Sequence, residues 1–475
     1  MFHFILFWQG RIETSCWVGA VKTRERRRAP PENLERRELL AGQPPLIADA
    51  ASYNAAYVNA VYHDALGREA NSAALADFTP QLDQGQSRGM VPVAVVQSAE
   101  YASDLVQADY QKYLWRLAEP NAVAAWTSLF DAGAQDDVLT ATIVASDEFY
   151  TRAGGDDAAW IAAAYQAVLG RASDASDLQT VERQLAEHVS RGVVALSIAA
   201  SPEHEMEVVN AVYQQYLHAA PDATDLSSWA AQLAAHQNTA EALAISLMSG
   251  NAYYELATGV PPTVVPVPVA LTAWQGRDDQ VTAEAAAASS APIVFIGDSI
   301  TQGWQLQQGA AVWNQYFAPL NAFDAGVGGD STESLLWRVE GGQLRGLAPK
   351  VVVLMVGINN ILPGDSPSDT AAGVAADIAA LRQQLPTSKI LLLGILPATP
   401  PSIYPLMQTI DAVNQSLPTL ADGRTVFYLN AGSAFIQADG TLNNSLYQSP
   451  PLQLNASGYA ALASAIAPQL KSLLA

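Results

Sequence analysis

The chain is poor in cysteine, in basic residues and, beyond its midpoint, in histidine. Cys16 is the only cysteine in 475 residues, which excludes an intrachain disulfide framework and a cysteine-rich metal site. Lysine and arginine number 24 against 46 aspartates and glutamates, a net charge of −22, so nucleic acid and anionic membrane surfaces are excluded as partners by repulsion. No histidine follows His236. Half of the residues are hydrophobic, which predicts two or three domains with sizeable cores.

The first 50 residues have the composition of a leader. The apolar run MFHFILFW is too short to span a bilayer and lacks the basic residues that precede a secretory signal, so no transmembrane segment is expected. Arg24 to Gly42 is rich in arginine and indicates either a disordered, solvated tail or an export signal. Its ENLERRELLAG portion resembles the leader of a class of bacterial extracellular proteins. We therefore predict a disordered leader or export segment over 1–50 and an extracellular or cell-surface location in a bacterium.

Residues 51–257 repeat a pattern. Tyrosines open four similar phrases at spacings of 51, 52 and 51 residues, at Tyr62, Tyr113, Tyr165 and Tyr216. Each copy closes with a serine expected to cap a helix, at Ser98, Ser146, Ser201 and Ser249. Apolar residues recur at helical spacing and the interiors are rich in alanine, so the region is predicted to be four helical copies of about 51 residues.

The phrases ALGRE and VLGRA in the first and third copies resemble a bacterial repeat known as domain of unknown function 4214. That resemblance implies an extracellular or surface setting and no known chemistry. The second and fourth copies depart from it, with Leu-Trp-Arg and His-Ala-Ala in place of Leu-Gly-Arg. The histidines of the region lack metal-ligand spacing and are expected to be surface or capping residues. No metal is therefore expected.

Beyond the repeats, residues 258–291 are first rich in proline and valine and then in alanine and serine, which predicts a linker. Residues 292–475 alternate short apolar, β-branched runs with helical stretches. This alternation predicts an α/β domain with a parallel sheet covered on both faces. Sites in such domains lie at the carboxyl ends of the strands.

Three motifs follow predicted strands at that edge. Gly297-Asp298-Ser299 could present a serine at a helix N-terminus, although a serine there is equally an N-cap. Gly326 to Asp330 (GVGGD) could bring backbone N–H groups close to a carbonyl, and Asn359 in GINN could donate a side-chain amide to the same oxygen. A plain turn explains each motif alone, but their order and placement together point to acyl chemistry.

On GDSITQ, Trp313 to Val339 and Pro349 to Asn360, the domain resembles the SGNH/GDSL hydrolases, and among them the platelet-activating-factor acetylhydrolase catalytic-subunit type. The resemblance implies a flavodoxin-like α/β/α fold, with Ser299 as the nucleophile. It implies the Ser299 N–H, the Gly329 N–H and the Asn359 amide as oxyanion donors. Structural roles are implied for Asp298, Trp337 and Arg338. It also implies no cofactor and a homodimer.

The base of that family is absent. Its last motif, Asp-x-x-His, falls on Pro450 and Gln453 by the flanking residues, and neither side chain can take a proton from serine. Three substitutes remain open: a repeat-region histidine such as His204 or His236, a carboxylate such as Asp365 or Asp439, or a different alignment of the last loop.

Three functions therefore remain open. The domain is an esterase for small acyl, above all acetyl, esters of lipid or surface glycan, impaired by loss of its base. Alternatively it is an inactive module that binds an acyl group, a carboxylate or a carbohydrate on a helical scaffold. The third and plainest alternative is a structural surface protein.

Overall fold

The computed structural model of the chain describes residues 50–398 and 406–475. These residues divide into two compact units. One comprises Ala55–Phe78 and Ser87–Gly259, and the other comprises Val260–Ala475 with the short segments 50–54 and 79–86. The predicted leader lies outside the described residues, apart from its last position.

The part of the chain before the sheet is helical, as predicted. Its elements are α2 (Ala50–Leu66), α3 (Ser72–Asp83), α4 (Met90–Val96), α5 (Ala99–Leu114), α6 (Pro120–Asp131), α7 (Asp136–Val144), α8 (Asp147–Ala153), α9 (Asp157–Leu169), α10 (Ala175–Ala186), α11 (Arg191–Ala199), α12 (Pro202–Tyr216), α13 (Ala223–Ala234), α14 (Ala240–Ser249) and α15 (Asn251–Thr258). Four sets of three helices recur along it, as α2–α3–α4, α5–α6–α7, α9–α10–α11 and α12–α13–α14.

Residues in the left-handed conformation define the phase of these copies. The first helix of each copy ends next to one of them, with φ between 53° and 68°: Gly67, Trp115, Gly170 and His218. These positions are 48, 55 and 48 residues apart. The second helix ends near another set with the same spacing: Gly85, Gly133, His188 and His236. Three of the histidines predicted to be surface or capping residues thus lie at helix ends where other copies have glycine.

The even spacing expected from the tyrosines is therefore wrong. The equivalent tyrosines are Tyr62, Tyr110, Tyr165 and Tyr213, so Tyr113 and Tyr216 lie three residues out of phase. The spacing of 55 residues between the second and third copies is longer than the other two because the third copy is entered through two helices. A turn at Gly154 and Gly155 separates α8 from α9, whereas α5 and α12 are continuous.

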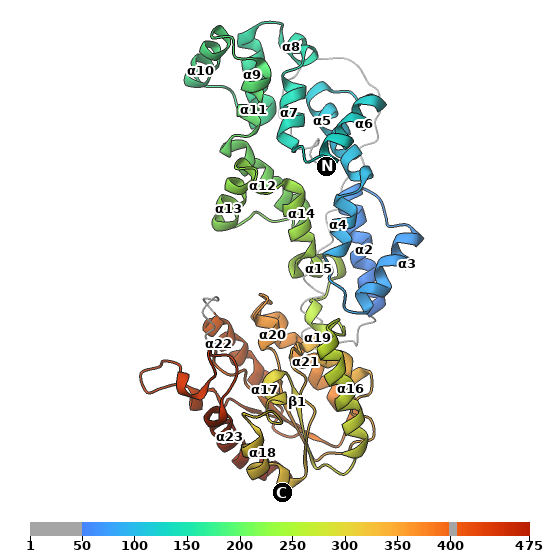
Figure 1. Cartoon of the computed structure of the whole chain (residues 1–475), viewed down its shortest axis with the longest axis vertical. Helices are drawn as coiled ribbons and strands as arrows, with labels where there is room; N and C mark the ends of the chain where they lie inside the picture. Colours follow the sequence, from blue (N-terminus) through green and yellow to red (C-terminus); the bar gives the residue numbers. More distant parts are fainter. Residues whose placement is uncertain (1–49, 399–405) are drawn as a thin grey trace. The chain divides into compact units, whose positions relative to one another are not determined.

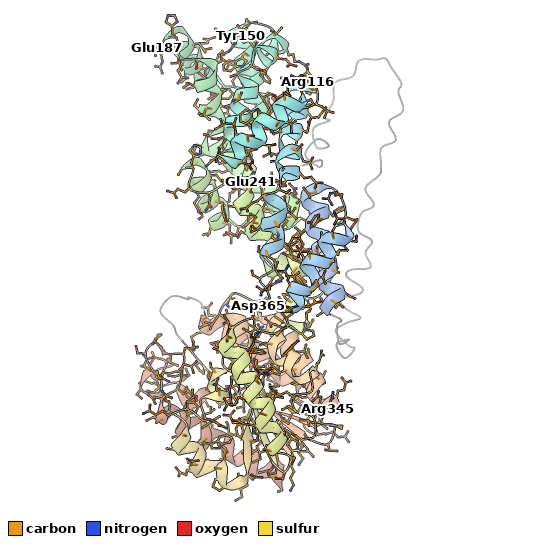
Figure 2. All side chains as sticks on the ribbon, turned by 45° about the vertical axis from the view of Figure 1, so that its right-hand side comes forward. Arg116, Tyr150, Glu187, Glu241, Arg345 and Asp365 are labelled. Carbon is orange, nitrogen blue, oxygen red and sulfur yellow. The ribbon has the colours of Figure 1, made fainter. Side chains whose placement is uncertain are left out.

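The first three copies each have an ion pair at equivalent positions. The pairs are Arg68–Glu100, Arg116–Glu148 and Arg171–Glu203, at 2.6, 2.7 and 2.6 Å. Each guanidinium also lies over a ring of the equivalent tyrosines, at 5.2 to 5.3 Å from the ring centre. Arg116 is labelled in Figure 2. The fourth copy has Ala219 and Asn251 at these positions and lacks the pair.

Three of the four predicted serine caps are caps. Ser98, Ser146 and Ser201 each accept a hydrogen bond from the backbone N–H three residues ahead. Ser249 does not, because it is the last residue of α14 and donates to the carbonyl of Ile245 instead.

The C-terminal unit contains a five-stranded parallel sheet in the order β2-β1-β3-β4-β5, with helices on both faces (Figure 1). Its strands are β1 (Ile293–Gly297), β2 (Ala322–Asp324), β3 (Val351–Met355), β4 (Lys389–Leu393) and β5 (Val426–Leu429). Its α-helices are α16 (Thr272–Ala287), α17 (Ser299–Gln302), α18 (Ala310–Tyr316), α19 (Thr332–Glu340), α20 (Ile358–Ile361), α21 (Pro367–Gln384), α22 (Leu406–Ser416) and α23 (Ala456–Leu474). The predicted three-layer α/β/α class is confirmed.

Alternate residues of each strand enter two different cores, because successive side chains of a strand point to opposite faces. Val294 and Ile296 of β1 pack with α16, α19, α21 and α22. Ile293 and Phe295 pack with α18 and α23. Both faces are covered, which explains why the strands have continuous apolar runs.

The segment predicted to be a linker is part of the C-terminal unit. Residues Thr272–Ala287 form α16, and Trp274, Val281 and Ala285 on it are buried in the core. Ahead of α16, the carbonyl of Thr263 accepts a hydrogen bond from Thr332 of α19 at 3.0 Å. The linker prediction relied on composition, but alanine-rich sequence with few breakers also favours helix when one face can be buried.

Among the helices in residues 50–398 and 406–475, none combines the length and hydropathy that a bilayer span requires.

Candidate active site

The predicted site residues come from neighbouring positions in the sheet. Ser299 follows β1, Gly329 lies in the loop after β2, and Asn359 lies on α20 after β3. Because β2, β1 and β3 are adjacent and parallel, their carboxyl ends meet at one edge. Gln453 reaches this edge from the loop before α23. The structure therefore brings Ser299, Gly329, Asn359 and Gln453 together.

Ser299 is the first residue of α17, and Asp298 is its N-cap. The Asp298 carboxylate accepts a hydrogen bond from the backbone N–H of Ile300 at 2.9 Å. Burial raises the pKa of Asp298 to about 7, although this hydrogen bond opposes the shift. Asp298 therefore shapes the turn, and the Ser299 hydroxyl is left half-buried at the site.

Gly329 has a backbone conformation that requires glycine, with φ at +92°. The neighbouring Gly328 lies against Ser299, since a Cβ added there would be 3.5 Å from the Ser299 Cβ. The backbone N–H of Gly328 donates to the Gln302 side chain at 2.7 Å. Among the described residues, the backbone N–H groups of Ser299 and Gly329 have no hydrogen-bond acceptor. Both can therefore donate to a ligand.

Asn359 is held in place by the same loop. Its Nδ2 donates to the carbonyl oxygen of Asp330 at 2.8 Å, which uses one of the two N–H groups of the amide. The second remains for a ligand oxygen. The neighbouring Asn360 does not face the same ligand position, because its buried side chain donates to Thr332 and Asp365.

Gln453, which the resemblance aligns with the family's histidine, bonds to Ser299. Its Nε2 donates to the Ser299 Oγ at 2.8 Å, and this is the only hydrogen bond of that hydroxyl within the described ranges. With the amide rotated by half a turn, the serine would donate to the amide oxygen. In neither orientation can an amide take the proton. The hydroxyl therefore remains protonated.

Pro450 does not replace the orienting aspartate. Its ring is exposed and has no group that accepts a hydrogen bond. Its carbonyl accepts from the backbone N–H of Leu452 at 2.9 Å within the turn.

The substitute bases considered above have other partners. Asp365 is buried and bonded to Asn360, and Asp439 accepts from Thr441 in an exposed turn. His204 contacts the carbonyl of Val168 at 3.0 Å, and burial lowers its pKa to about 4. His236 contacts the Gln135 side chain at 2.6 Å.

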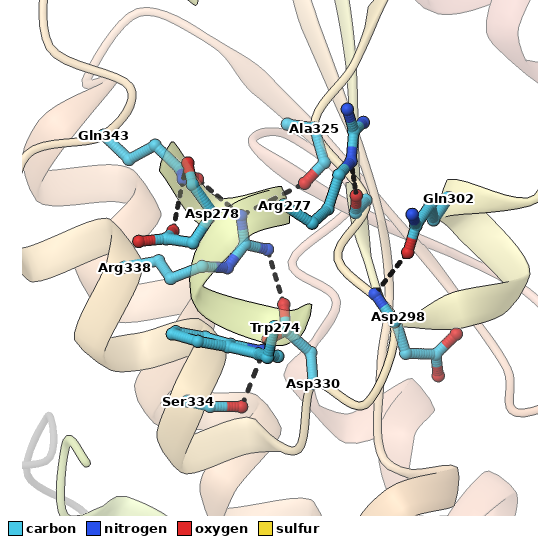
Figure 3. A network of polar contacts seen from close by, with 12 residues as sticks. Trp274, Arg277, Asp278, Asp298, Gln302, Ala325, Asp330, Ser334, Arg338 and Gln343 are labelled. Carbon is cyan, nitrogen blue, oxygen red and sulfur yellow. Dashed lines mark hydrogen bonds and ion pairs between the residues drawn. The ribbon is translucent and has the colours of Figure 1, made fainter. Parts of the chain in front are cut away.

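Three residues at the site were missed in the sequence. Gln302 holds Gly328, while Trp274 and Arg277 of α16 bond to the loop that carries Gly329 (Figure 3). The sequence did contain one indication of this role. Trp274 and Arg277 lie one helical turn apart in a stretch that is otherwise polar and rich in alanine. No set of three or more histidine, cysteine or carboxylate side chains in the described part of the chain has the geometry of a metal site.

Family models match both parts of the chain. The model of the GDSL-like Lipase/Acylhydrolase family matches residues 295–461. The model of a domain of unknown function, DUF4214, matches residues 48–105 and 140–208, which contain the first and third copies of the repeat. The C-terminal unit is therefore an acylhydrolase-like domain, with Ser299 at the end of its first strand.

Curated relatives also match the C-terminal unit. Human platelet-activating factor acetylhydrolase IB subunit alpha1 is 34% identical over 186 residues, which are 38% of this chain and 77% of the human protein. The bovine subunit alpha1 is 35% identical over 154 residues, 32% of this chain. The chain spans 63% of the length of that bovine relative. The chain belongs to the GDSL-like lipase/acylhydrolase family.

A solved GDSL-like lipase from Bacteroides thetaiotaomicron is also similar, with 19% identity and a TM-score of 0.36. The similarity covers 41% of this chain and 97% of that one.

Proposed function

We propose that the C-terminal domain is an impaired ester hydrolase that still binds small acyl groups, above all acetyl, at Ser299. The observation that carries this proposal is the 2.8 Å hydrogen bond from Gln453 to the Ser299 hydroxyl. It places an amide where the reaction needs a group that can accept a proton near neutral pH.

Binding and proton transfer depend on different residues in this site. The N–H groups of Ser299, Gly329 and Asn359 can surround a carbonyl or carboxylate oxygen without any base. Nucleophilic attack by the serine requires that its proton leave. In serine hydrolases, loss of a triad member lowers the rate by about 10⁴ to 10⁶, whereas oxyanion donors and binding alone retain about 10³ to 10⁴ over water. Acyl binding with slow or absent turnover follows.

The second candidate is a binding module with no turnover, which takes an acyl group or carboxylate on surface glycan or lipid. Acetylhydrolase names among the relatives support an acetyl ligand, and the leader resemblance supports an extracellular setting. The resembled subunits support a homodimer.

The first experiment measures hydrolysis of 4-nitrophenyl acetate by the full-length chain. The set consists of wild type, Ser299→Ala, Gln453→His and the double change Pro450→Asp with Gln453→His. We expect wild type to hydrolyse the ester only slightly faster than Ser299→Ala, because an impaired hydrolase retains slow turnover through its serine; equal rates would favour the second candidate. We expect the double change to raise the rate by about 10²-fold or more, since it returns both a base and its orienting carboxylate.

Two further results complete the test. Adding Ser299→Ala to the double change must abolish the gain, which shows that the restored activity uses this serine. Fast turnover by wild type that disappears in Ser299→Ala would show that the chain has a base other than residue 453, and the proposal of impairment would be wrong.

A further inference from the structure

Helix α16 bonds to both ends of the loop that carries Gly329. The Trp274 Nε1 donates to the carboxylate of Asp330 at 2.8 Å. One turn later, the Arg277 Nε donates to the carbonyl of Gly326 at 3.1 Å. All of these side chains are buried, and Figure 3 shows them converging on the loop from α16. The helix lies before the residues that the family model matches, which begin at 295.

Asp330 connects two of the oxyanion donors. It follows Gly329 in the chain, and its carbonyl oxygen accepts from Asn359 at 2.8 Å. Its carboxylate is fully buried and accepts from Trp274, Ser334 and Arg338, the last at 2.5 Å. A shift of Asp330 would therefore move the Gly329 N–H and the Asn359 amide together.

The loop has little to hold its own shape, since one backbone hydrogen bond joins its residues in the described structure, from the Asp330 N–H to the Val327 carbonyl at 3.2 Å. Three of its five residues, Gly326 to Asp330, are glycines, which have the widest backbone freedom of any residue. Gly329 has a side-chain neighbour only at a distance, since a Cβ there would lie 3.9 Å from the Trp274 ring. Oxyanion donors are effective when they are fixed before the ligand arrives. Anchors outside the loop must supply that rigidity.

We propose that Trp274 and Arg277 are positioning residues of the acyl site, which set the Gly329 N–H and the Asn359 amide through Asp330 and Gly326. This inference rests on the proposed function, because it concerns the same donors. Helix α16 is then a component of the ligand site, although it lies outside the matched domain.

The test compares Trp274→Phe with Trp337→Phe in the full-length chain. Both changes remove an indole, and the two rings are neighbours with centres 5.9 Å apart. Only Trp274 donates to the loop; Trp337 has no hydrogen bond to it in the described part of the chain. Arg277→Met is paired in the same way with the exposed Arg345→Met (Figure 2).

The first readout is the affinity for acetate, from its effect on thermal unfolding, with Asn359→Ala as the variant that lacks one donor. We expect Trp274→Phe and Arg277→Met to weaken acetate binding by about 10-fold or more, a smaller effect than the loss of a whole donor. The controls Trp337→Phe and Arg345→Met should stay within about twofold of wild type. Folded Trp274→Phe and Arg277→Met chains that bind acetate like wild type would overturn the proposal.

The second readout is kinetic and uses the chain with Pro450→Asp and Gln453→His. There, Trp274→Phe should lower kcat for 4-nitrophenyl acetate much more than it raises KM, because the donors act on the transition state. Together, the two readouts separate the two proposals. Absence of acetate binding in wild type counts against the proposed function, whereas unchanged kcat in both α16 variants counts against the positioning role. If Trp274→Phe fails to fold, the same comparison is made with Arg277→Lys.

Discussion

Single residues decide the chemistry of this domain through burial as much as through identity. Asp298, Asp324 and Asp330 are buried around the site, and burial raises their pKa values to about 7, 7 and 6. For Asp330 the Arg338 guanidinium opposes the shift without cancelling it. Asp377 on α21 is the extreme case, because neither of its oxygens has a hydrogen-bond partner in the described residues. Burial holds its pKa well above the usual range.

When folding raises the pKa of a carboxyl group, the folded chain is more stable at low pH than at high pH. Such a group contributes stability that is fully present below its unfolded pKa, near 4, and lost as pH rises through its folded pKa. We expect Asp377→Asn to stabilise the chain at pH 8, by about 1.4 kcal/mol for each unit by which folding raises the pKa. The gain should shrink at pH 5 and vanish near pH 4.

The measurement is denaturant unfolding of wild type and Asp377→Asn at these three pH values. The exposed Asp439→Asn is the control, since it should give no gain at pH 8. A destabilising effect of Asp377→Asn at pH 8 would show that the carboxylate is charged and useful in the folded chain.

At the scale of elements, helix ends organise the repeats. The two sets of left-handed positions near helix ends comprise eight residues, and four of them are glycine. The other four are Trp115 and His218 in the first set and His188 and His236 in the second. The side chain of His188 is exposed and makes no hydrogen bond within the described residues. A side chain in this conformation costs about 1 kcal/mol, which glycine avoids.

We expect His188→Gly to raise the free energy of unfolding by about 0.5 to 1 kcal/mol, because the strain it removes exceeds the entropy that glycine adds to the unfolded chain. The matched reverse change is Gly133→Ala at an equivalent position. A Cβ there meets nothing within 4 Å, so its expected loss of about 1 kcal/mol reflects backbone strain alone. Denaturant unfolding checks both. Equal stability of all three chains would mean that these positions relax without strain.

At the scale of the whole molecule, the boundary of the C-terminal unit lies at Val260. The strand-and-motif pattern alone suggests a start near 292, which would leave α16 out. That helix buries Trp274, Val281 and Ala285 in the core, which together stabilise the unit by several kcal/mol, roughly 1.5 to 3 for each large side chain. This is a large part of the 5 to 15 kcal/mol typical of a domain.

We therefore expect a chain of residues 260–475 to unfold cooperatively and a chain of residues 288–475 to be unfolded or aggregated. Circular dichroism and thermal unfolding compare the two directly. If both melt at the same temperature, α16 contributes nothing to the fold, and its role in the acyl site would have to be abandoned as well.

Sequence reasoning reached the fold class and the convergence of Ser299, Gly329, Asn359 and Gln453 because each depends on local signals. A buried strand followed by a turn residue is visible in a few positions, and parallel strands place such turns at one edge. The phase of the repeats was missed because tyrosine spacing is a weaker marker than backbone conformation. Helix α16 was missed because nothing in its composition shows which face will be buried.

By itself, the sequence determined that Gln453 and Pro450 stand where the resembled family has its Asp-x-x-His motif, and that no histidine follows His236. It also determined the helical repeats and the α/β domain, through periodicity and strand composition. Only the tertiary structure decided that Gln453 bonds to Ser299 across 154 residues of chain and that α16 bonds to the loop that carries Gly329. It also decided that Asp298, Asp324, Asp330 and Asp377 have raised pKa values. These properties depend on which groups lie next to one another and on exclusion of water, and both arise only when distant segments pack.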